Sequence, residues 1–305
     1  MAIKDSFGRS VENLRISVTQ RCNFRCIYCH REGQLFDSNV ELSAEEIKRI
    51  VSIAASLGVY SVKLTGGEPL LRKDIVEIVR GISSIPGIKD ISMTTNGFFL
   101  KEYAKQLKDA GLSRVNVSLD TLNAEKFKFI TGVDAHKRIM DGIVEAARVG
   151  LNPIKINMVL LKGINCDEVE DMIKFTEENQ LILQLIELEG FGDDPLYIKY
   201  HADLDDIEKK VRERSLRVIV RQMHHRKKYI LKGGAEVEIV KPMHNTEFCL
   251  YCNRIRLTSD GKLKPCLFRN DNLIDLLGPM RSGADDNYLK DLFIEAVRRR
   301  RPFFM

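Results

Sequence analysis

The stretch "LRISVTQRCNFRCIYCH" (residues 14–30) joins a short strand directly to a loop that carries three cysteines. Arg15 and Ser17 alternate with Ile16 and Val18, so one face of this strand is polar and the other apolar. The cysteines begin just beyond the carboxyl end of the strand, where barrels of alternating strands and helices carry their active sites. The stretch therefore predicts the first unit of an α/β fold with a functional loop.

Five more strands follow, each separated from the next by an amphipathic helical segment. The segment at 43–58 is typical, because Ser43 and Glu46 form a capping box and Gly58 ends the helix. Six such units in series favour a partial (β/α)6 barrel over a flat doubly wound sheet. The strands are expected at residues 14–19, 59–65, 88–95, 112–120, 153–161 and 181–189.

The pattern changes beyond residue 188, where hairpins and short helices replace the regular units. We therefore expect two domains: residues 1–188 as the barrel and residues 189–305 as a smaller α+β domain. The last helices are expected at 271–278 and 287–300.

Five of the strands alternate polar and apolar residues, whereas most buried parallel strands are continuously apolar. Because helices pack against the outer face of a barrel, the polar positions should line its lumen. These positions are Arg15, Ser17, Thr19, Lys63, Thr65, Ser92, Thr94, Asn96, Asn116, Ser118, Asp120, Lys155 and Asn157. With a formal net charge of only +5, the chain suits a small anionic ligand in a local pocket, and the charge does not argue for nucleic acid.

The first cysteine set has the spacing C-x3-C-x2-C, formed by Cys22, Cys26 and Cys29. No apolar stretch is long enough to span a bilayer and no signal peptide is evident, so we expect a cytoplasmic protein with reduced thiols. Three thiolates suit a [4Fe–4S] cluster whose fourth iron stays open. A zinc site is the alternative; His30 is an awkward fourth ligand because it directly follows Cys29.

The second set, C-x2-C-x13-C, is formed by Cys249, Cys252 and Cys266. Arg254 and Arg256 follow on one face of the next strand, where cations can pair with phosphate oxygens. The seventh cysteine, Cys166, opens a helical segment, and we interpret it as structural.

Two motifs, "CNFRCIYC" (22–29) and "GGEP" (66–69), together resemble the radical S-adenosylmethionine (SAM) enzymes. The segment "CNRIRLTSDGKLKPCLF" (252–268) is similar to the auxiliary-cluster region of the GTP 3′,8-cyclases, the molybdenum cofactor biosynthesis protein A family. The resemblance extends over nearly the whole chain and includes "TTNG" (94–97), "VNVSLD" (115–120) and "KINMV" (155–159). It implies a lyase that converts GTP to (8S)-3′,8-cyclo-7,8-dihydroguanosine 5′-triphosphate, after a 5′-deoxyadenosyl radical removes hydrogen from C3′ of the ribose.

The resemblance also implies a role for each matching residue. The first cysteine set would hold the [4Fe–4S] cluster that cleaves SAM, and the second would hold another whose open iron receives the guanine of GTP. The SAM-contacting positions are Tyr28, Gly67, Ser118 and Glu189. The GTP-contacting positions are Arg15, Lys63, Thr94, Lys155, Arg254, Ile255 and Arg256, of which Arg254 and Arg256 are also expected to serve catalysis.

Three features depart from the family pattern. Lys63 stands where the family usually has arginine, which keeps the charge but loses the bidentate fork. Glu189 lies in "LIELEG" (185–190), where bacterial members carry an I-E-aromatic-M-like segment. The chain ends in "RRRRPFFM" (298–305) in place of a Gly-Gly tail, and we interpret the arginine run as a solvated helix end.

Two other interpretations stay open. One is a radical SAM enzyme that modifies peptides, although such enzymes generally carry more than three cysteines in the carboxyl-terminal part. The other is a zinc-binding regulatory or nucleic-acid module. For the cyclase, the expected partners are GTP, a flavodoxin- or ferredoxin-like electron donor and a downstream cyclic pyranopterin monophosphate synthase. The family resemblance also allows a homodimer, and we expect neither a membrane nor a nucleic-acid partner.

Overall fold

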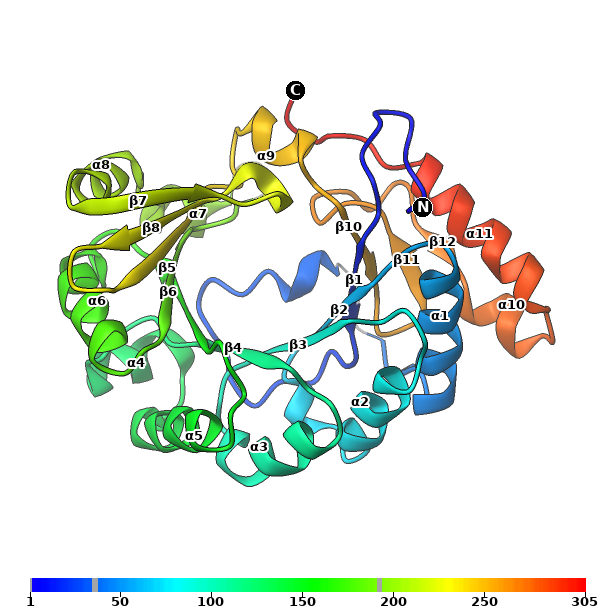
Figure 1. Ribbon diagram of the computed structural model, residues 1–305, viewed down its shortest axis with the longest axis horizontal. Helices are drawn as coiled ribbons and strands as arrows, with labels where there is room; N and C mark the ends of the chain where they lie inside the picture. Colours follow the sequence, from blue (N-terminus) through cyan, green and yellow to red (C-terminus); the bar gives the residue numbers. More distant parts are fainter. Residues whose placement is uncertain (1, 35–37, 191–193) are drawn as a thin grey trace.

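A curved sheet of parallel strands forms the centre of the molecule in the computed structural model, which describes residues 2–34, 38–190 and 194–305 (Figure 1). Six strands lie side by side in chain order: β1 (Asn13–Ser17), β2 (Ser61–Thr65), β3 (Asp90–Thr95), β4 (Arg114–Ser118), β5 (Lys155–Leu160) and β6 (Ile182–Glu187). Each neighbouring pair is parallel. The prediction of a partial (β/α)6 barrel is confirmed.

Helices cover the outer face of this sheet (Figure 1). They are α1 (Ala44–Ser56), α2 (Ile75–Ser83), α3 (Leu100–Asp109), α4 (Ala124–Thr131), α5 (His136–Arg148) and α6 (Val169–Glu178). The predicted capping box of α1 is present, since Ser43 accepts from the backbone of Glu46 and Glu46 accepts from that of Ser43. The short helix α4 was not predicted; the side chain of Asn123 caps it.

The segment after β6 adds strands to both edges of the barrel sheet. Its strands are β7 (Ser215–Val220), β8 (Lys227–Leu231), β9 (Glu236–Val240), β10 (Arg254–Leu257), β11 (Lys262–Lys264) and β12 (Ile274–Asp275). Strand β9 pairs in parallel with β6, and β10 pairs in parallel with β1. The predicted hairpins β8–β9 and β10–β11 are antiparallel. In the described residues all twelve strands thus form one sheet.

The helices of this segment are α7 (Pro195–Tyr200), α8 (Asp205–Glu213), α9 (Thr246–Leu250), α10 (Leu277–Arg281) and α11 (Asp286–Arg298). The helix expected at 271–278 was wrong, because that stretch contains β12 and only the start of α10. Ile274 pairs with Leu263 of β11, so this short apolar stretch completes the sheet edge instead of coiling.

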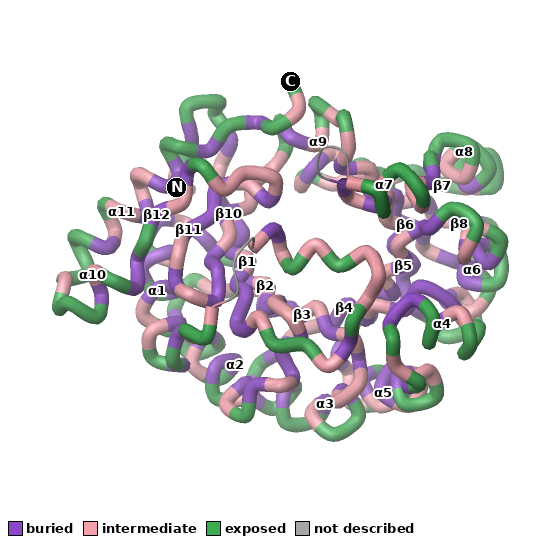
Figure 2. Tube along the Cα trace, turned by 180° about the vertical axis from the view of Figure 1, so that it is seen from behind, coloured by how far each residue is buried: buried purple, intermediate pink, exposed green. Residues whose placement is uncertain are grey.

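Buried residues are concentrated in the strands and on the helices that pack against them (Figure 2), and the apolar core lies between these layers. The inner surface of the sheet is lined mainly by polar residues. In β1, Leu14 and Ile16 are completely buried in this core, and Arg15 between them faces the lumen. Of the polar positions predicted to line the lumen, all do so except Ser17 and Thr19, which are buried at the carboxyl end of β1. None of the helices in the described part of the chain is both long and apolar enough to cross a membrane.

Candidate active site in the barrel lumen

The lumen is a cavity of about 600 Å³, and all six cysteines of the two sets line it. The first set lies in the loop after β1. The second comes from α9, from the turn after it and from the segment that follows β11. Because β10 runs parallel to β1, the second set lies at the amino-terminal end of β1, and the first set lies beyond its carboxyl-terminal end. All seven cysteines are free thiols, and Cys166 packs against the core outside the cavity lining.

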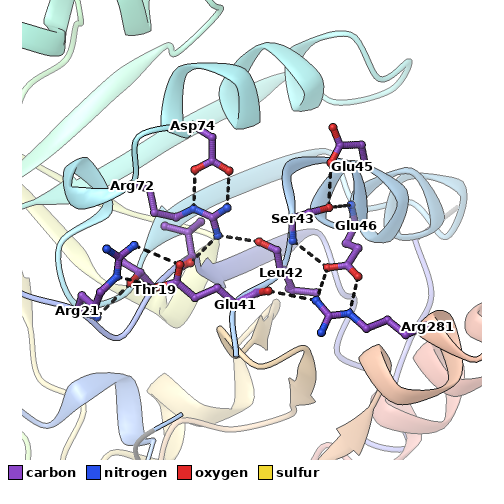
Figure 3. Close-up of polar contacts among 11 residues, drawn as sticks. Thr19, Arg21, Glu41, Leu42, Ser43, Glu45, Glu46, Arg72, Asp74 and Arg281 are labelled. Carbon is purple, nitrogen blue, oxygen red and sulfur yellow. Dashed lines mark hydrogen bonds and ion pairs between the residues drawn. The ribbon is translucent and has the colours of Figure 1, made fainter. Parts of the chain in front are cut away.

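A polar network holds both ends of the first cysteine loop (Figure 3). Arg72 donates to the carbonyl oxygens of Val18 and Leu42, at 3.0 and 2.7 Å, and its guanidinium also pairs with Asp74. Glu41 accepts from Thr19 at the start of the loop. These contacts fix the two points where the loop leaves and rejoins the barrel.

Two glycines let the loop lie against the end of β2. A Cβ atom on Gly67 would lie 2.2 Å from the backbone oxygen of Arg21, and Gly66 has a φ of +139°. The next residue, Glu68, is completely buried and accepts from the backbone of Asn96 at 2.6 Å and from Thr95 at 2.7 Å. Burial raises the pKa of Glu68 to about 7.

The three thiols of the first set lie close to one another. Burial raises the pKa of Cys22 and Cys26; the nearby carboxylates, Glu68 for Cys22 and Asp120 for Cys26, raise it further, followed by the neighbouring thiols. Among the described residues, no three His, Cys, Asp or Glu side chains close around a single metal ion. His30, the candidate zinc ligand, lies 3.1 Å from Glu189 through Nε2. The donor set fits a thiolate-ligated cluster with an open position.

A row of cations crosses three adjacent strands on the lumen side. Arg15 of β1 lies in register with Arg256 of β10 on one side and with Lys63 of β2 on the other. Neighbouring strands are about 4.8 Å apart, so the row spans roughly 10 Å. Arg15 pairs with Glu32; burial alone would raise the pKa of Glu32, but Arg15 and Arg256 lower it to about 2.

Neither Lys63 nor Arg256 of this row has a hydrogen-bond acceptor among the described residues. Burial, followed by the charges of Arg15 and Arg114, holds the pKa of Lys63 well below its ordinary value. The Nε groups of Arg15 and Arg256 are also buried without a hydrogen-bond partner in the described chain. Unpaired donors of this kind favour an anionic ligand, which would accept from them.

Lys155 is already neutralised by a partner that the sequence did not reveal. Glu238 of β9 is completely buried and accepts from Lys155, from Arg221 at 2.6 Å and from Gln184 at 2.6 Å. Burial lowers the pKa of Lys155 to about 7, although Glu238 opposes this shift.

The predicted SAM-contacting residues line the cavity together. Tyr28 donates to Asp120 at 2.6 Å, and Asp120 also accepts from the backbone of Val159 at 2.8 Å. Burial raises the pKa of Asp120 to about 6. Gly67, Ser118 and Glu189 line the same cavity.

Comparison with known proteins identifies the family. Residues 16–176 match the Radical SAM superfamily, and residues 181–305 match Molybdenum Cofactor Synthesis C. The chain is 51% identical over 306 residues to a "Probable GTP 3′,8-cyclase" of Thermococcus kodakarensis, covering 98% of this chain and 99% of the relative. The chain belongs to the GTP 3′,8-cyclase family of radical SAM proteins. A second member, from Methanothermobacter thermautotrophicus, is 50% identical over 308 residues, covering 100% of this chain and 99% of that protein.

Solved structures show that the fold extends beyond the GTP 3′,8-cyclase family. Streptococcus suis SuiB bound to S-adenosylmethionine matches with a TM-score of 0.66 at 20% identity, over 84% of this chain and 60% of that chain. Native anSMEcpe with bound AdoMet matches with a TM-score of 0.64 at 18% identity, over 95% and 81% of the respective chains.

The family positions expected to contact GTP do not all present side chains to the lumen. Arg15, Lys63, Thr94, Lys155, Arg254 and Arg256 line the cavity. Ile255 is completely buried on the opposite face of β10, so only its backbone is near the lumen. Sequence reasoning missed Glu32 and Arg226, which also line it, and Glu238, which accepts from Lys155. Of these three residues, only Glu238 could have been found from the sequence, because it is a polar position in the alternating stretch "EVEIV" (236–240).

The interpretation of the arginine run as a solvated helix end was wrong for one of its members. Arg300 follows α11, its side chain is only 1% exposed, and it contacts Asp5 at 3.2 Å. Arg298, Arg299 and Arg301 are exposed, although Arg301 also lies at the lining of the cavity.

Proposed function

We propose that this protein converts GTP to (8S)-3′,8-cyclo-7,8-dihydroguanosine 5′-triphosphate by radical SAM chemistry, as a lyase in the first step of molybdenum cofactor biosynthesis. The observation that carries the proposal is a single lumen lined by two three-cysteine sets and by the cation row of Arg15, Lys63 and Arg256. Relatives that match nearly the full chain bear the name of this activity.

In this proposal Cys22, Cys26 and Cys29 hold a [4Fe–4S] cluster, which supplies the electron for reductive cleavage of SAM. Gly67 lets the backbone approach the ligand closely, because no Cβ fills the space beside the loop. Tyr28, Ser118 and Glu189 present polar groups to SAM. Tyr28 is fixed by Asp120, and Glu189 by His30, so both are held in place before the ligand binds.

Cys249, Cys252 and Cys266 hold a second [4Fe–4S] cluster, whose open iron receives the guanine. The cation row binds the triphosphate, with Lys63 and the unpaired donors of Arg15 and Arg256 as its principal contacts. Arg254 adds a further cation beside this row, because it pairs with Asn13, two residues before Arg15 on β1. Thr94, Lys155 and the backbone of Ile255 complete the GTP site.

We further propose two domains, residues 1–188 and 189–305, the second of which closes the substrate cavity. A flavodoxin- or ferredoxin-like protein supplies electrons, and a cyclic pyranopterin monophosphate synthase uses the product. These partners follow from the family resemblance, which also allows a homodimer; the cytoplasmic location follows from the sequence pattern described above.

The test is product analysis under anaerobic conditions. Reconstituted protein should carry about eight irons, as two cubane clusters require. With GTP, SAM and a reductant it should form the cyclised nucleotide together with 5′-deoxyadenosine. Intact GTP beside 5′-deoxyadenosine would refute the cyclase assignment.

Two cysteine variants separate the roles of the two sets. Cys266→Ser should still cleave SAM but should not cyclise GTP. Cys166→Ser, outside the cavity, is the matched control and should retain both reactions. Cyclisation by Cys266→Ser would show that the second set is not the GTP site.

A further inference from the structure

Two buried arginines donate hydrogen bonds to backbone oxygens of the second cysteine set. Arg9 donates through Nη1 to the backbone oxygen of Cys249 at 2.8 Å, and Arg300 donates through Nη2 to that of Cys252. One carboxylate joins them: Oδ2 of Asp5 lies 2.8 Å from Nε of Arg9 and 3.2 Å from Nη1 of Arg300. We call Asp5, Arg9 and Arg300 the buried triad.

The buried triad is assembled from segments at the two ends of the chain. The amino-terminal segment and the chain after α11 lie side by side next to α9 (Figure 1). The side chains of Asp5, Arg9 and Arg300 are only 0%, 7% and 1% exposed. Oδ1 of Asp5 accepts from the backbone of Phe7 and of Arg9, both at 3.0 Å, so this carboxylate is firmly placed.

The charges of the buried triad do not cancel. Two guanidinium groups share one carboxylate, which leaves a single positive charge in a site removed from water. That charge lies beside Cys252, whose backbone oxygen accepts from Nη2 of Arg300. In addition, Nε of Arg300 is buried without a hydrogen-bond partner among the described residues.

We propose that Arg300, placed by Asp5 and Arg9, is a positioning residue that supplies the counter-charge of the second cluster. The proposal rests on the second cluster of the proposed function. An oxidised [4Fe–4S] core carries two positive charges, so three thiolates leave the cluster with one negative charge, which the buried triad matches.

This arrangement acts on the redox chemistry of the cluster. Reduction adds a negative charge, and a nearby buried cation stabilises the reduced state more than the oxidised one. Arg300 therefore raises the reduction potential of the second cluster. The carboxylate of Asp5 and the backbone oxygen of Arg9, both of which lie within 3.3 Å of Nη1 of Arg300, keep the guanidinium in position as the charge changes.

The experiment measures the second cluster by itself. In full-length protein with Cys22, Cys26 and Cys29 replaced by alanine, redox titration followed by electron paramagnetic resonance reports only that cluster. Arg300→Gln should lower the reduction potential of this cluster. At a fixed applied potential, the ratio of reduced to oxidised cluster should fall at least tenfold, which corresponds to about 59 mV for one electron. Asp5→Asn leaves both arginines unneutralised and should raise the potential. Arg300→Lys should stay near the parent value.

If Arg300 acts as a counter-charge, Arg300→Gln and Asp5→Asn shift the reduction potential in opposite directions. Loosening of the loop would shift the potential of both variants in the same direction. The proposal is overturned if neither Arg300→Gln nor Asp5→Asn changes the potential, or if both change it in one direction. If Arg300→Gln binds no iron while Arg300→Lys binds about four, the counter-charge is supported. If the cysteine-depleted parent itself binds no iron, the second cluster of the proposed function fails, and this proposal with it.

Discussion

Replacing Arg72 with methionine is expected to destabilise the first cysteine loop strongly. Arg72 is 5% exposed and makes charge-assisted hydrogen bonds to the carbonyl oxygens of Val18 and Leu42, at the two ends of the loop. Hydrogen bonds to charged groups contribute about 1.5–3 kcal/mol each, and methionine leaves both oxygens without this donor. The pair with Asp74, which is 35% exposed, adds little. We therefore expect a loss of about 3–5 kcal/mol in the free energy of unfolding.

The assay is urea unfolding of the metal-free protein, combined with iron analysis after anaerobic reconstitution. Arg281→Met is the matched control from the same network (Figure 3): Arg281 is 49% exposed and contacts Glu46, so its removal should cost less than about 1 kcal/mol. Arg72→Met should also lose iron from the first cluster. If Arg72→Met unfolds at the same urea concentration as Arg281→Met, this account of the loop is wrong.

Three other changes test the lumen. Gly67→Ala should displace the cysteine loop and reduce bound iron, because its Cβ would lie 2.2 Å from a backbone oxygen; Gly81→Ala, whose Cβ meets nothing nearer than 3.6 Å, is the control for iron analysis. Burial raises the pKa of Glu68 to about 7, so the folded state retains a proton that the unfolded chain loses near pH 4.3. The stability that this proton provides is present below about pH 4 and falls by on the order of 3 kcal/mol as the pH rises through 7. Unfolding of the metal-free protein at several pH values should show this loss, and Glu68→Gln should not. Lys63→Met should weaken GTP binding roughly tenfold, a change of about 1.4 kcal/mol, in equilibrium binding measurements. Lys105→Met, on the exposed side of α3, should leave the affinity unchanged; equal affinities for both variants would contradict a phosphate role for Lys63.

The barrel and its polar lumen could be predicted from sequence because a strand repeats every two residues. That period placed Arg15, Lys63 and Ser118 on the inner face without knowledge of any partner. Their neighbours could not be predicted in the same way. Glu238 pairs with Lys155 across 83 positions, a contact that depends on the register of β9 beside β6.

The ends of the chain were hardest to predict, because a local pattern gives no information about long-range packing. An arginine run after a helix usually lies in solvent, but Arg300 is held in the interior by Asp5 and by the backbone oxygens of Arg9 and Cys252. The stretch at 271–278 has apolar residues that suit either a helix or a strand. Ile274 in this stretch pairs with Leu263 of β11, and this pairing stabilises the strand instead of the helix.

The position of β10 beside β1 has a consequence for synthesis on the ribosome. Asn13 meets Arg254 across 241 positions, so the edge of the first strand stays unpaired until most of the chain has been made. At about 5–20 residues per second, that interval lasts on the order of 10–50 s. An unpaired strand edge invites association with other nascent chains. We therefore expect that the yield of native protein depends on protecting this edge during translation, and that amino-terminal fragments ending before β10 aggregate.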